Sequence, residues 1–161
     1  MPVLIASDHA GVDLKSELMR SMPDVDWEDL GPVARDSVDY PDFADKVAQR
    51  VQREPALRGV LICGSGQGMA MRANKYANVR AALVWNDEVA RLSRQHNDAN
   101  VIALPGRFVS TEQAAGFVRR FLETAFEGGR QGAQGGNTSR AVEGGAKPRQ
   151  RPRRAKPHPA A

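Results

Sequence analysis

The sequence predicts an α/β fold in which a parallel five-stranded sheet lies between two layers of helices. Two observations lead to this prediction. Short apolar runs alternate with amphipathic segments through residues 1–127, which favours right-handed crossovers between parallel strands. The chain has 161 residues, enough for one domain with a substantial core. We therefore expect one domain over residues 1–127 and a separate tail over residues 128–161.

Five short apolar runs are expected to form the strands. Their length and their β-branched or alternating residues are typical of strands that are buried or half-buried in a sheet. They are VLIAS (3–7), VDWEDL (25–30), GVLIC (59–63), VRAALVW (79–85) and NVIALP (100–105).

A segment of helical period follows each of these strands. Between residues 42 and 54, for example, Phe43, Val47 and Val51 fall on one helical face. Ser110 is expected to cap the last helix. The expected helices span residues 12–22, 42–54, 69–75, 87–96 and 111–125.

The charge is divided unevenly along the chain. Residues 1–127 hold 15 Lys and Arg against 18 Asp and Glu, whereas residues 128–161 hold 8 against 1. The tail is rich in Gly, Pro and Arg and has little to bury, so we expect it to be disordered beyond Arg130. Its charge attracts polyanions weakly at low salt. A solubilising extension is nevertheless the favoured interpretation, and no nucleic-acid partner is expected beyond this attraction.

Cys63 is the single cysteine, which excludes an intrachain disulfide and fits a reducing compartment. The N-terminal stretch MPVLIASDHAG has no basic segment, and its apolar run is too short for a signal peptide. No stretch approaches the roughly 18 apolar residues of a membrane-spanning helix. We therefore expect a cytoplasmic protein with no membrane partner.

The stretch ICGSGQG (62–68) follows the third predicted strand and is the clearest candidate for a binding loop. It lacks the lysine of a Walker loop, and its G-x-G-x-G spacing differs from the G-x-G-x-x-G of a dinucleotide site. A nucleotide-binding regulatory module remains an alternative. Glycines here let several backbone N–H groups point toward one anion, either a ligand's phosphate or the oxyanion of an intermediate.

Cys63 comes directly before these glycines. A lone cysteine at the end of a buried strand is commonly an inert core residue. Beside an array of N–H donors, however, the thiolate is favoured. A thiolate can remove a proton from carbon while the donors hold the resulting enolate oxygen. The position of Cys63 therefore favours a proton-transfer enzyme over a phosphate-binding module.

Other polar residues are expected at the same edge of the sheet because they follow predicted strands. Asp8 and His9 follow the first strand, although such a pair also fits a helix cap. Tyr40 lies in the loop after the second strand, where packing is the plainer interpretation, and Arg107 follows the fifth. His96 ends a helix, where a histidine commonly interacts with the helix dipole. The histidines lack metal-ligand spacing, so no metal is expected.

Seven short motifs occur in order over residues 1–130: SDHAG, VDYP, CGSGQG, ANK, RQHNDANV, PGR and EGGR. Together they resemble the ribose-5-phosphate isomerase B family, which includes the galactose-6-phosphate isomerase subunits, and in particular its branch with a catalytic cysteine. The resemblance implies a Rossmann-like sandwich that forms homodimers and uses no cofactor. It implies interconversion of ribose 5-phosphate and ribulose 5-phosphate through a cis-enediolate. A tetrose or hexose phosphate remains an alternative substrate, and tetramers remain open.

The resemblance also assigns roles to individual residues. Cys63 would move a proton between C1 and C2, and His96, aided by Asp8, would open the furanose ring. Tyr40 would line the sugar pocket. The implied catalytic residues are Cys63, His96, Asp8 and Ser65. The hole for the enediolate oxygen would be formed by Gly64, Ser65, Gly66, Gly68 and Asn97. The phosphate would be held by His9, Arg107 and Arg130.

Two features add expectations of their own. The family commonly carries a histidine and a second arginine after EGGR, where this chain has Gln131 and Gln134, which predicts a weaker phosphate grip or a different substrate. Cys63 ends a strand, whereas His96 ends the helix that leads into the fifth strand, so they lie at opposite edges, about 17–20 Å apart. If both act on one sugar, His96 comes from a partner chain, and homodimers have shared active sites.

Overall fold

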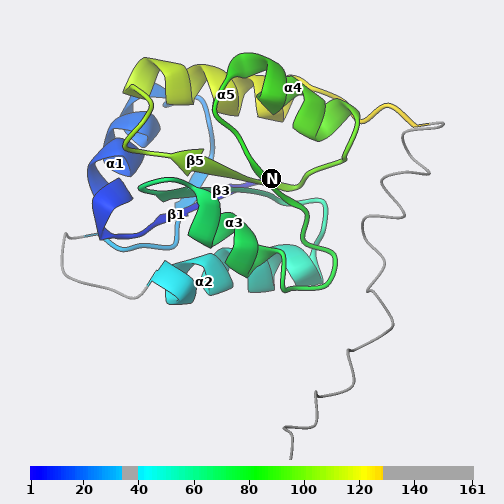
Figure 1. Cartoon of the computed structure of the whole chain (residues 1–161), viewed down its shortest axis with the longest axis horizontal. Coiled ribbons are helices and arrows are strands. Elements are labelled where there is room, and N and C mark those ends of the chain that lie inside the picture. The colour runs from blue at the N-terminus through cyan, green and yellow to red at the C-terminus, as the bar shows by residue number, and fades with distance from the viewer. Residues whose placement is uncertain (34–39, 129–161) are drawn as a thin grey trace, which may run out of the picture.

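The computed structural model describes residues 1–33 and 40–128, except the side chains of residues 40–42. Its centre is a sheet that lies between layers of helices (Figure 1). The strands are parallel and follow the order β2-β1-β3-β5-β4. The strands are β1 (Val3–Ser7), β2 (Trp27–Asp29), β3 (Arg58–Cys63), β4 (Ala81–Leu83) and β5 (Val101–Pro105). The predicted five-stranded parallel sheet is confirmed.

The central strands β1, β3 and β5 are buried almost throughout, which explains their continuous apolar sequences. Alternate side chains face opposite layers: Ile62 packs in the core on one side of the sheet and Cys63 in the core on the other. The carboxyl ends of the three strands are level, because Ser7 pairs with Ile62 and Cys63 pairs with Pro105. Loops that follow these strands therefore begin at one common edge.

The edge strands β2 and β4 have three residues each and are shorter than the apolar runs that contain them. The residues before each strand are used in turns instead. The Val25 N–H donates to the Met22 carbonyl, and the Val79 N–H donates to the Tyr76 carbonyl. Pairing with the neighbouring strand therefore begins only after these turns.

Helices cover both faces of the sheet (Figure 1). A short 3₁₀ helix, η1 (His9–Gly11), precedes α1. One face carries α1 (Val12–Ser21), α4 (Asp87–Gln95) and α5 (Thr111–Glu123). The other face carries α2 (Tyr40–Arg53) and α3 (Gln67–Ala73). The predicted three-layer α/β sandwich is confirmed.

The helix boundaries agree with the predictions to within two residues. Ser110 is confirmed as the cap of α5, because its Oγ accepts from the Gln113 N–H while the Gln113 side chain accepts from the Ser110 N–H. The prediction that Tyr40 lies in a loop is wrong, since α2 begins at this residue. Pro41 follows it, and proline suits the first turn of a helix, where its missing N–H is not needed.

The predicted tail beyond Gly128 lies outside the described residues, as does the segment 34–39 that leads into α2. In the described ranges, no helix combines the length and the apolar character needed to cross a membrane. In the sheet, β2 lies on one side of β1 and β3 on the other, so the order in which the strands are added reverses between β1 and β3. Ligands of open α/β sheets bind outside the carboxyl ends of the strands at such a point.

Candidate active site

A cavity of about 390 Å³ lies at the carboxyl ends of β1, β3 and β5, beside the switch point. This volume suits a small organic ligand. The lining residues come from three loops: Asp8, Cys63, Gly64, Ser65, Gly68, Arg107 and Phe108. All except Phe108 are among the residues that the sequence predicts. Residues distant in sequence thus meet here because parallel strands end at one edge.

Cys63 is the last residue of β3, and its side chain is only 7% exposed. The Gly66 N–H donates to the Cys63 Sγ over 3.1 Å. Gly66 adopts a φ of +76°, and a Cβ here would lie 2.5 Å from the Leu83 side chain. Only glycine allows the loop to turn back onto the sulfur in this way. The N–H that the sequence predicts to face an oxyanion therefore donates to the sulfur instead.

Arg107 brings a positive charge to the same cavity. Its backbone N–H donates to the Gly64 carbonyl over 3.1 Å, and the neighbouring Gly106 N–H donates to the Cys63 carbonyl over 2.8 Å. A Cβ on Gly64 would lie 3.2 Å from the Arg107 Nε, so the guanidinium packs against this glycine. The cavity therefore combines a sulfur base, a loop of backbone N–H groups and a cation, which suits proton removal from an anionic substrate.

Asp8 both caps a helix and lines the cavity, the two roles that its position in the sequence allows. Its Oδ1 accepts from the Gly11 N–H over 2.9 Å and so caps η1, while the residue also lines the cavity. Its own N–H donates to the Ile62 carbonyl, which ties the start of η1 to β3. His9 is the exposed first residue of η1, at the same edge of the sheet but outside the cavity lining.

His96 and Asn97 lie at the other end of the sheet. His96 follows the last residue of α4, and Asn97 lines a second cavity of about 1010 Å³ together with Arg58 and Arg80. Arg58 begins β3 and Cys63 ends it, so the two cavities are separated by about 17 Å of strand. Within one chain, the structure therefore does not bring His96 or Asn97 to Cys63.

Charged groups are crowded at this second cavity. Burial lowers the pKa of Arg58, and the charge of Arg94 lowers it further, whereas Asp98 raises it. Arg94 and Asp98 form an ion pair of 2.8 Å. Arg58, Arg80 and Arg94 thus make the amino edge of the sheet positively charged. The carboxylate of Asp98 is the ion-pair partner of Arg94.

Two further predicted residues lie outside what the structure describes: the side chain of Tyr40, and Arg130. The substituted positions Gln131 and Gln134 lie there too. Among the described residues, no three His, Cys, Asp or Glu side chains gather as a set of metal ligands. The expectation of a reaction without metal stays a prediction from the sequence.

Phe108 is the cavity residue that sequence reasoning missed. It follows the PGR motif directly and is 74% exposed. Met71 of α3 and Trp85 after β4 are also large, apolar and exposed, at 65% and 56%. A large apolar side chain beside a functional motif and outside any helical pattern is the signal that could have identified Phe108.

Known proteins are similar to this chain over most of its length. Residues 3–135 match the family model described as Ribose/Galactose Isomerase. The chain belongs to this family. It is 46% identical over 132 residues to a Mycoplasma pneumoniae protein named "probable ribose-5-phosphate isomerase B", a match that covers 80% of this chain and 87% of that protein. The predicted family resemblance is confirmed.

Solved structures of relatives share the fold. A ribose 5-phosphate isomerase from Thermotoga maritima is 41% identical and superimposes with a TM-score of 0.82, covering 86% of this chain and 97% of its own. A ribose-5-phosphate isomerase B from Mycoplasma genitalium, solved with bound ribulose-5-phosphate, is 40% identical with a TM-score of 0.80, covering 85% and 93%. These identities and scores extend over the full sandwich rather than one motif.

Proposed function

We propose that this chain is an aldose–ketose isomerase that interconverts ribose 5-phosphate and ribulose 5-phosphate through a cis-enediolate. The observation that carries the proposal is the Cys63 sulfur, which accepts a backbone N–H at the floor of a cavity also lined by Arg107. The family of the chain and the activity named for its relatives support the same reaction.

Cys63 acts as the base in both directions. Its thiolate removes the proton from C2 of the open-chain aldose, and the electrons of the broken C–H bond form the C1–C2 double bond of an enediolate. The thiol then returns the proton to C1 while the hydroxyl proton passes from O2 to O1, which gives the ketose and restores the thiolate. Because one sulfur transfers the proton, removal and return occur on one face of the enediolate. The N–H groups of Gly64, Ser65 and Gly68 stabilise the enediolate oxygen.

Arg107, His9 and Arg130 bind the phosphate in this proposal, and Tyr40 lines the sugar pocket. Arg107 is the member of this set that lines the described cavity. A guanidinium is suited to phosphate because its N–H groups form a planar fork. Asp8 is the carboxylate residue in the lining of this cavity, and in this proposal its side chain binds sugar hydroxyls.

His96 and Asn97 act in the site of a second subunit. They lie at the amino edge of their own sheet, whereas Cys63 lies at the carboxyl edge. A two-fold axis beside the edge strand β4, perpendicular to the strands, would reverse the partner's strands. The partner's amino edge would then lie next to this chain's carboxyl edge, and each site of the homodimer would receive a ring-opening histidine.

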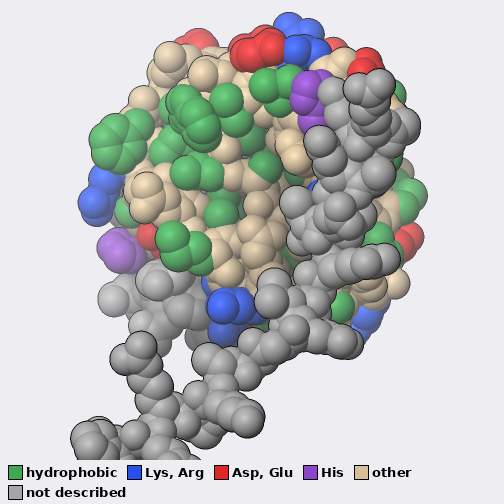
Figure 2. Space-filling model, turned by 45° about the vertical axis from the view of Figure 1, so that its right-hand side comes forward, with side chains coloured by type: hydrophobic (Ala, Val, Ile, Leu, Met, Phe, Trp, Pro, Cys, Tyr) green, Lys and Arg blue, Asp and Glu red, His purple; other side chains and the backbone are tan. Residues whose placement is uncertain are grey.

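An exposed apolar surface supports this association. Met71, Trp85 and Phe108 come from α3 and from the segments after β4 and β5, three neighbouring elements. Figure 2 shows hydrophobic side chains gathered on part of the visible surface. Exposed apolar patches of this kind commonly mark interfaces. Pairing of such dimers into tetramers would need a further surface.

The domain that carries the activity is residues 1–127 in this proposal, completed by Arg130 at the start of the basic tail. The tail beyond Arg130 is dispensable. A single cysteine fits a reducing compartment, so we place the enzyme in the cytoplasm. Gln131 and Gln134 stand where the family commonly carries a histidine and an arginine, which keeps a tetrose or hexose phosphate as a second substrate class.

A substrate panel tests the proposal. Pentose, tetrose and hexose phosphates are each incubated with the full chain and a chelator, and aldose–ketose interconversion is followed. We expect the highest kcat/KM for ribose 5-phosphate and ribulose 5-phosphate. A higher value for a tetrose or hexose phosphate would change the substrate assignment, and no turnover of any sugar phosphate would overturn the proposed function.

A further inference from the structure

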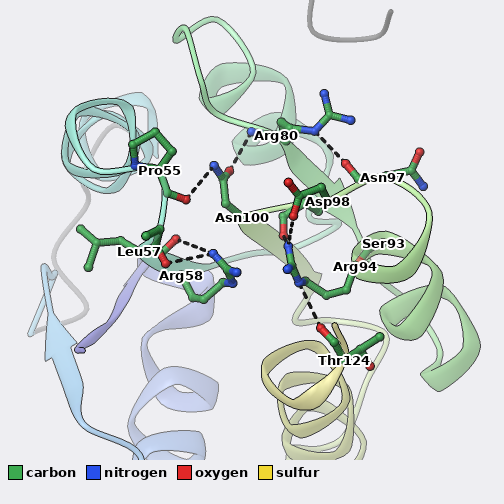
Figure 3. Close-up of polar contacts among 12 residues, drawn as sticks. Pro55, Leu57, Arg58, Arg80, Ser93, Arg94, Asn97, Asp98, Asn100 and Thr124 are labelled. Atoms are coloured by element: carbon green, nitrogen blue, oxygen red, sulfur yellow. Dashed lines mark hydrogen bonds and ion pairs between the residues drawn. The ribbon is translucent and has the colours of Figure 1, made fainter. Parts of the chain in front are cut away.

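The turn after α4 is held by a buried arginine. Arg94 is 5% exposed, and its Nη1 donates to the Asp98 Oδ1 over 2.8 Å and to the Ala99 carbonyl over 2.7 Å (Figure 3). Its Nε donates to the Thr124 carbonyl over 3.3 Å. One guanidinium therefore bonds the turn on one side and the end of α5 on the other.

The backbone of this turn adopts a conformation that needs support. Asp98 has a φ of +47°, in the left-handed region that few residues other than glycine, asparagine and aspartate adopt readily. The Asp98 N–H donates to the Arg94 carbonyl, while the Asp98 carboxylate accepts from the Arg94 side chain. Backbone and side chain of the same arginine thus hold one aspartate in place.

The rest of the turn is anchored from the start of β4. The Arg80 Nε donates to the Asn97 carbonyl over 2.7 Å, and the Arg80 N–H donates to the Asn100 Oδ1 over 2.8 Å (Figure 3). The Asn100 Nδ2 donates to the Asn78 carbonyl over 2.8 Å. Between these anchors His96 remains half-buried and Asn97 remains exposed. The network therefore fixes the backbone of the turn and leaves these two side chains at the surface.

The same arginine reaches the segment that leads toward Arg130. Thr124 is the C-terminal cap of α5, and three residues later the Glu127 N–H donates to the Gln95 carbonyl over 3.0 Å. The chain leaving α5 is therefore bonded to the end of α4 at two places, and Arg94 makes one of them. Arg130 follows Glu127 by three residues in the sequence.

Stability alone is a weak explanation for such an arginine. Burying an ion pair costs desolvation that often equals the attraction gained, and apolar replacements of buried pairs are often neutral or stabilising. A buried guanidinium instead fixes the positions of its partners, because its planar N–H groups bond several acceptors at fixed angles. The acceptors here are the backbone and carboxylate of one functional turn and the end of α5.

We propose that Arg94 is a positioning residue that holds the His96–Asn97 turn against the end of α5, in the geometry needed by the active site of the partner subunit. This inference rests on the proposed function and on its shared sites. Arg94 contacts no substrate in this arrangement and acts through the turn.

Kinetics of single variants give the first test. Arg94→Lys keeps the charge but lacks the planar guanidinium whose Nε and Nη1 bond acceptors on two sides. Arg94→Met removes the charge as well. We expect kcat for ribose 5-phosphate to fall about 10-fold in Arg94→Lys and about 100-fold in Arg94→Met, since small misplacements of catalytic groups have effects of this size. KM should change by less than about threefold. Asp98→Asn keeps a residue suited to positive φ and should lose less activity than Arg94→Met.

Arg119→Met is the matched control. Arg119 is another ion-paired arginine, bonded to Asp24 at 2.6 Å and 2.9 Å, on the helix that Arg94 contacts. We expect its kcat to equal that of the unaltered enzyme. If Arg94→Lys and Arg94→Met are as active as Arg119→Met, the proposal is wrong.

Heterodimers separate positioning from a general loss of structure. Co-expression with two different tags isolates each pair. Cys63→Ala with Arg94→Lys leaves one site in which both Cys63 and the partner's turn are unaltered, so about half the wild-type activity is expected. His96→Ala with Arg94→Lys leaves no such site, so its activity should stay below that of Arg94→Lys alone. A structural defect within the Arg94→Lys subunit would also impair the first pair, and that result would overturn the proposal.

The pair Cys63→Ala with His96→Ala tests the shared site independently of Arg94. Recovery of about half the wild-type activity supports sharing between subunits. If this pair is inactive, both the shared site and the Arg94 proposal fail, whereas the isomerase activity of the unaltered chain still stands. If this pair is active but the Arg94 variants match the control, only the Arg94 proposal fails.

Discussion

The two ends of the sheet are built from different groups. At the carboxyl edge, backbone groups provide much of the bonding, as where the Gly66 N–H donates to the Cys63 sulfur. At the amino edge, long side chains provide it, with Arg94, Arg80 and Asn100 bonding the turn after α4 (Figure 3). The carboxyl edge forms a cavity for a ligand, and the amino edge presents two side chains outward.

The difference follows from what each end has to do. An edge that surrounds a small anion needs its backbone close to the ligand, which only glycine-rich loops allow. In the proposed shared site, the amino edge supplies side chains to a second subunit and must hold them without help from that subunit. Buried, hydrogen-bonded side chains provide such a scaffold. The comparison therefore predicts large chemical effects at the carboxyl edge and smaller geometric effects elsewhere.

Cys63→Ala should have the largest effect. Removal of the general base is expected to lower kcat roughly 10²- to 10⁴-fold. The loss occurs in the transition state, so binding of substrate should change little. Turnover is measured from ribose 5-phosphate, and folding from circular dichroism and Tm. A variant that keeps more than a few per cent of the wild-type kcat would show that Cys63 is not the general base.

Gly66→Ala tests whether the loop conformation supports the sulfur. The positive φ and the close Leu83 side chain leave little room for a Cβ, and such strain costs about 1–3 kcal/mol. We expect a lower Tm together with a lower kcat, because the N–H that donates to the Cys63 sulfur would move.

Gly116→Ala is the control for this glycine. Gly116 lies within α5, where a Cβ would meet no atom within 4 Å. Alanine there should raise stability by about 0.5–1 kcal/mol, because glycine is unfavourable in a helix, and should leave kcat unchanged. Equal effects of the two substitutions on kcat would contradict a special role for Gly66.

Asp45→Asn should have the smallest effect, because it alters an ion pair between α2 and α3 rather than either edge. Hydrogen bonds from Arg72 hold the pKa of Asp45 below its ordinary value of 3.8, and burial opposes this only in part. The carboxylate therefore adds stability above pH 3.8 that is lost as the pH falls through its lower folded-state value. At pH 7 the variant should melt within about 2 °C of the wild type. The difference in Tm between the variant and the wild type should vanish in acid. A difference that grows in acid would contradict a stabilising ion pair between Asp45 and Arg72.

Most of the fold follows from local patterns in the sequence. The central strands are recognisable because they are buried on both faces and hence continuously apolar, as in VLIAS and GVLIC. The edge strands are predicted too long, because an apolar run does not reveal where pairing gives way to a turn. Tyr40 is misplaced for a similar reason, since the tyrosine and proline of VDYP suit a loop as well as the first turn of a helix.

The site is predictable only in part. Asp8, Cys63 and Arg107 are found because residues after parallel strands share one edge. The network of Arg94 and Arg80 is not, because its bonds join segments that are far apart in the sequence and carry no local pattern. The N–H of Gly66 donates to the sulfur instead of facing the cavity, which depends on one backbone dihedral angle that no sequence pattern specifies.

Phe108 belongs to two surfaces at once. It lines the cavity that holds Cys63 and Arg107, and it is also one of the exposed apolar side chains of the molecule. Whatever covers this ring also narrows the route by which water enters the cavity. With less water, the effective dielectric constant around the guanidinium falls, and its attraction for a bound anion increases. Burial of one phenyl ring at an interface would therefore strengthen the electrostatics of a site that the ring does not bond to.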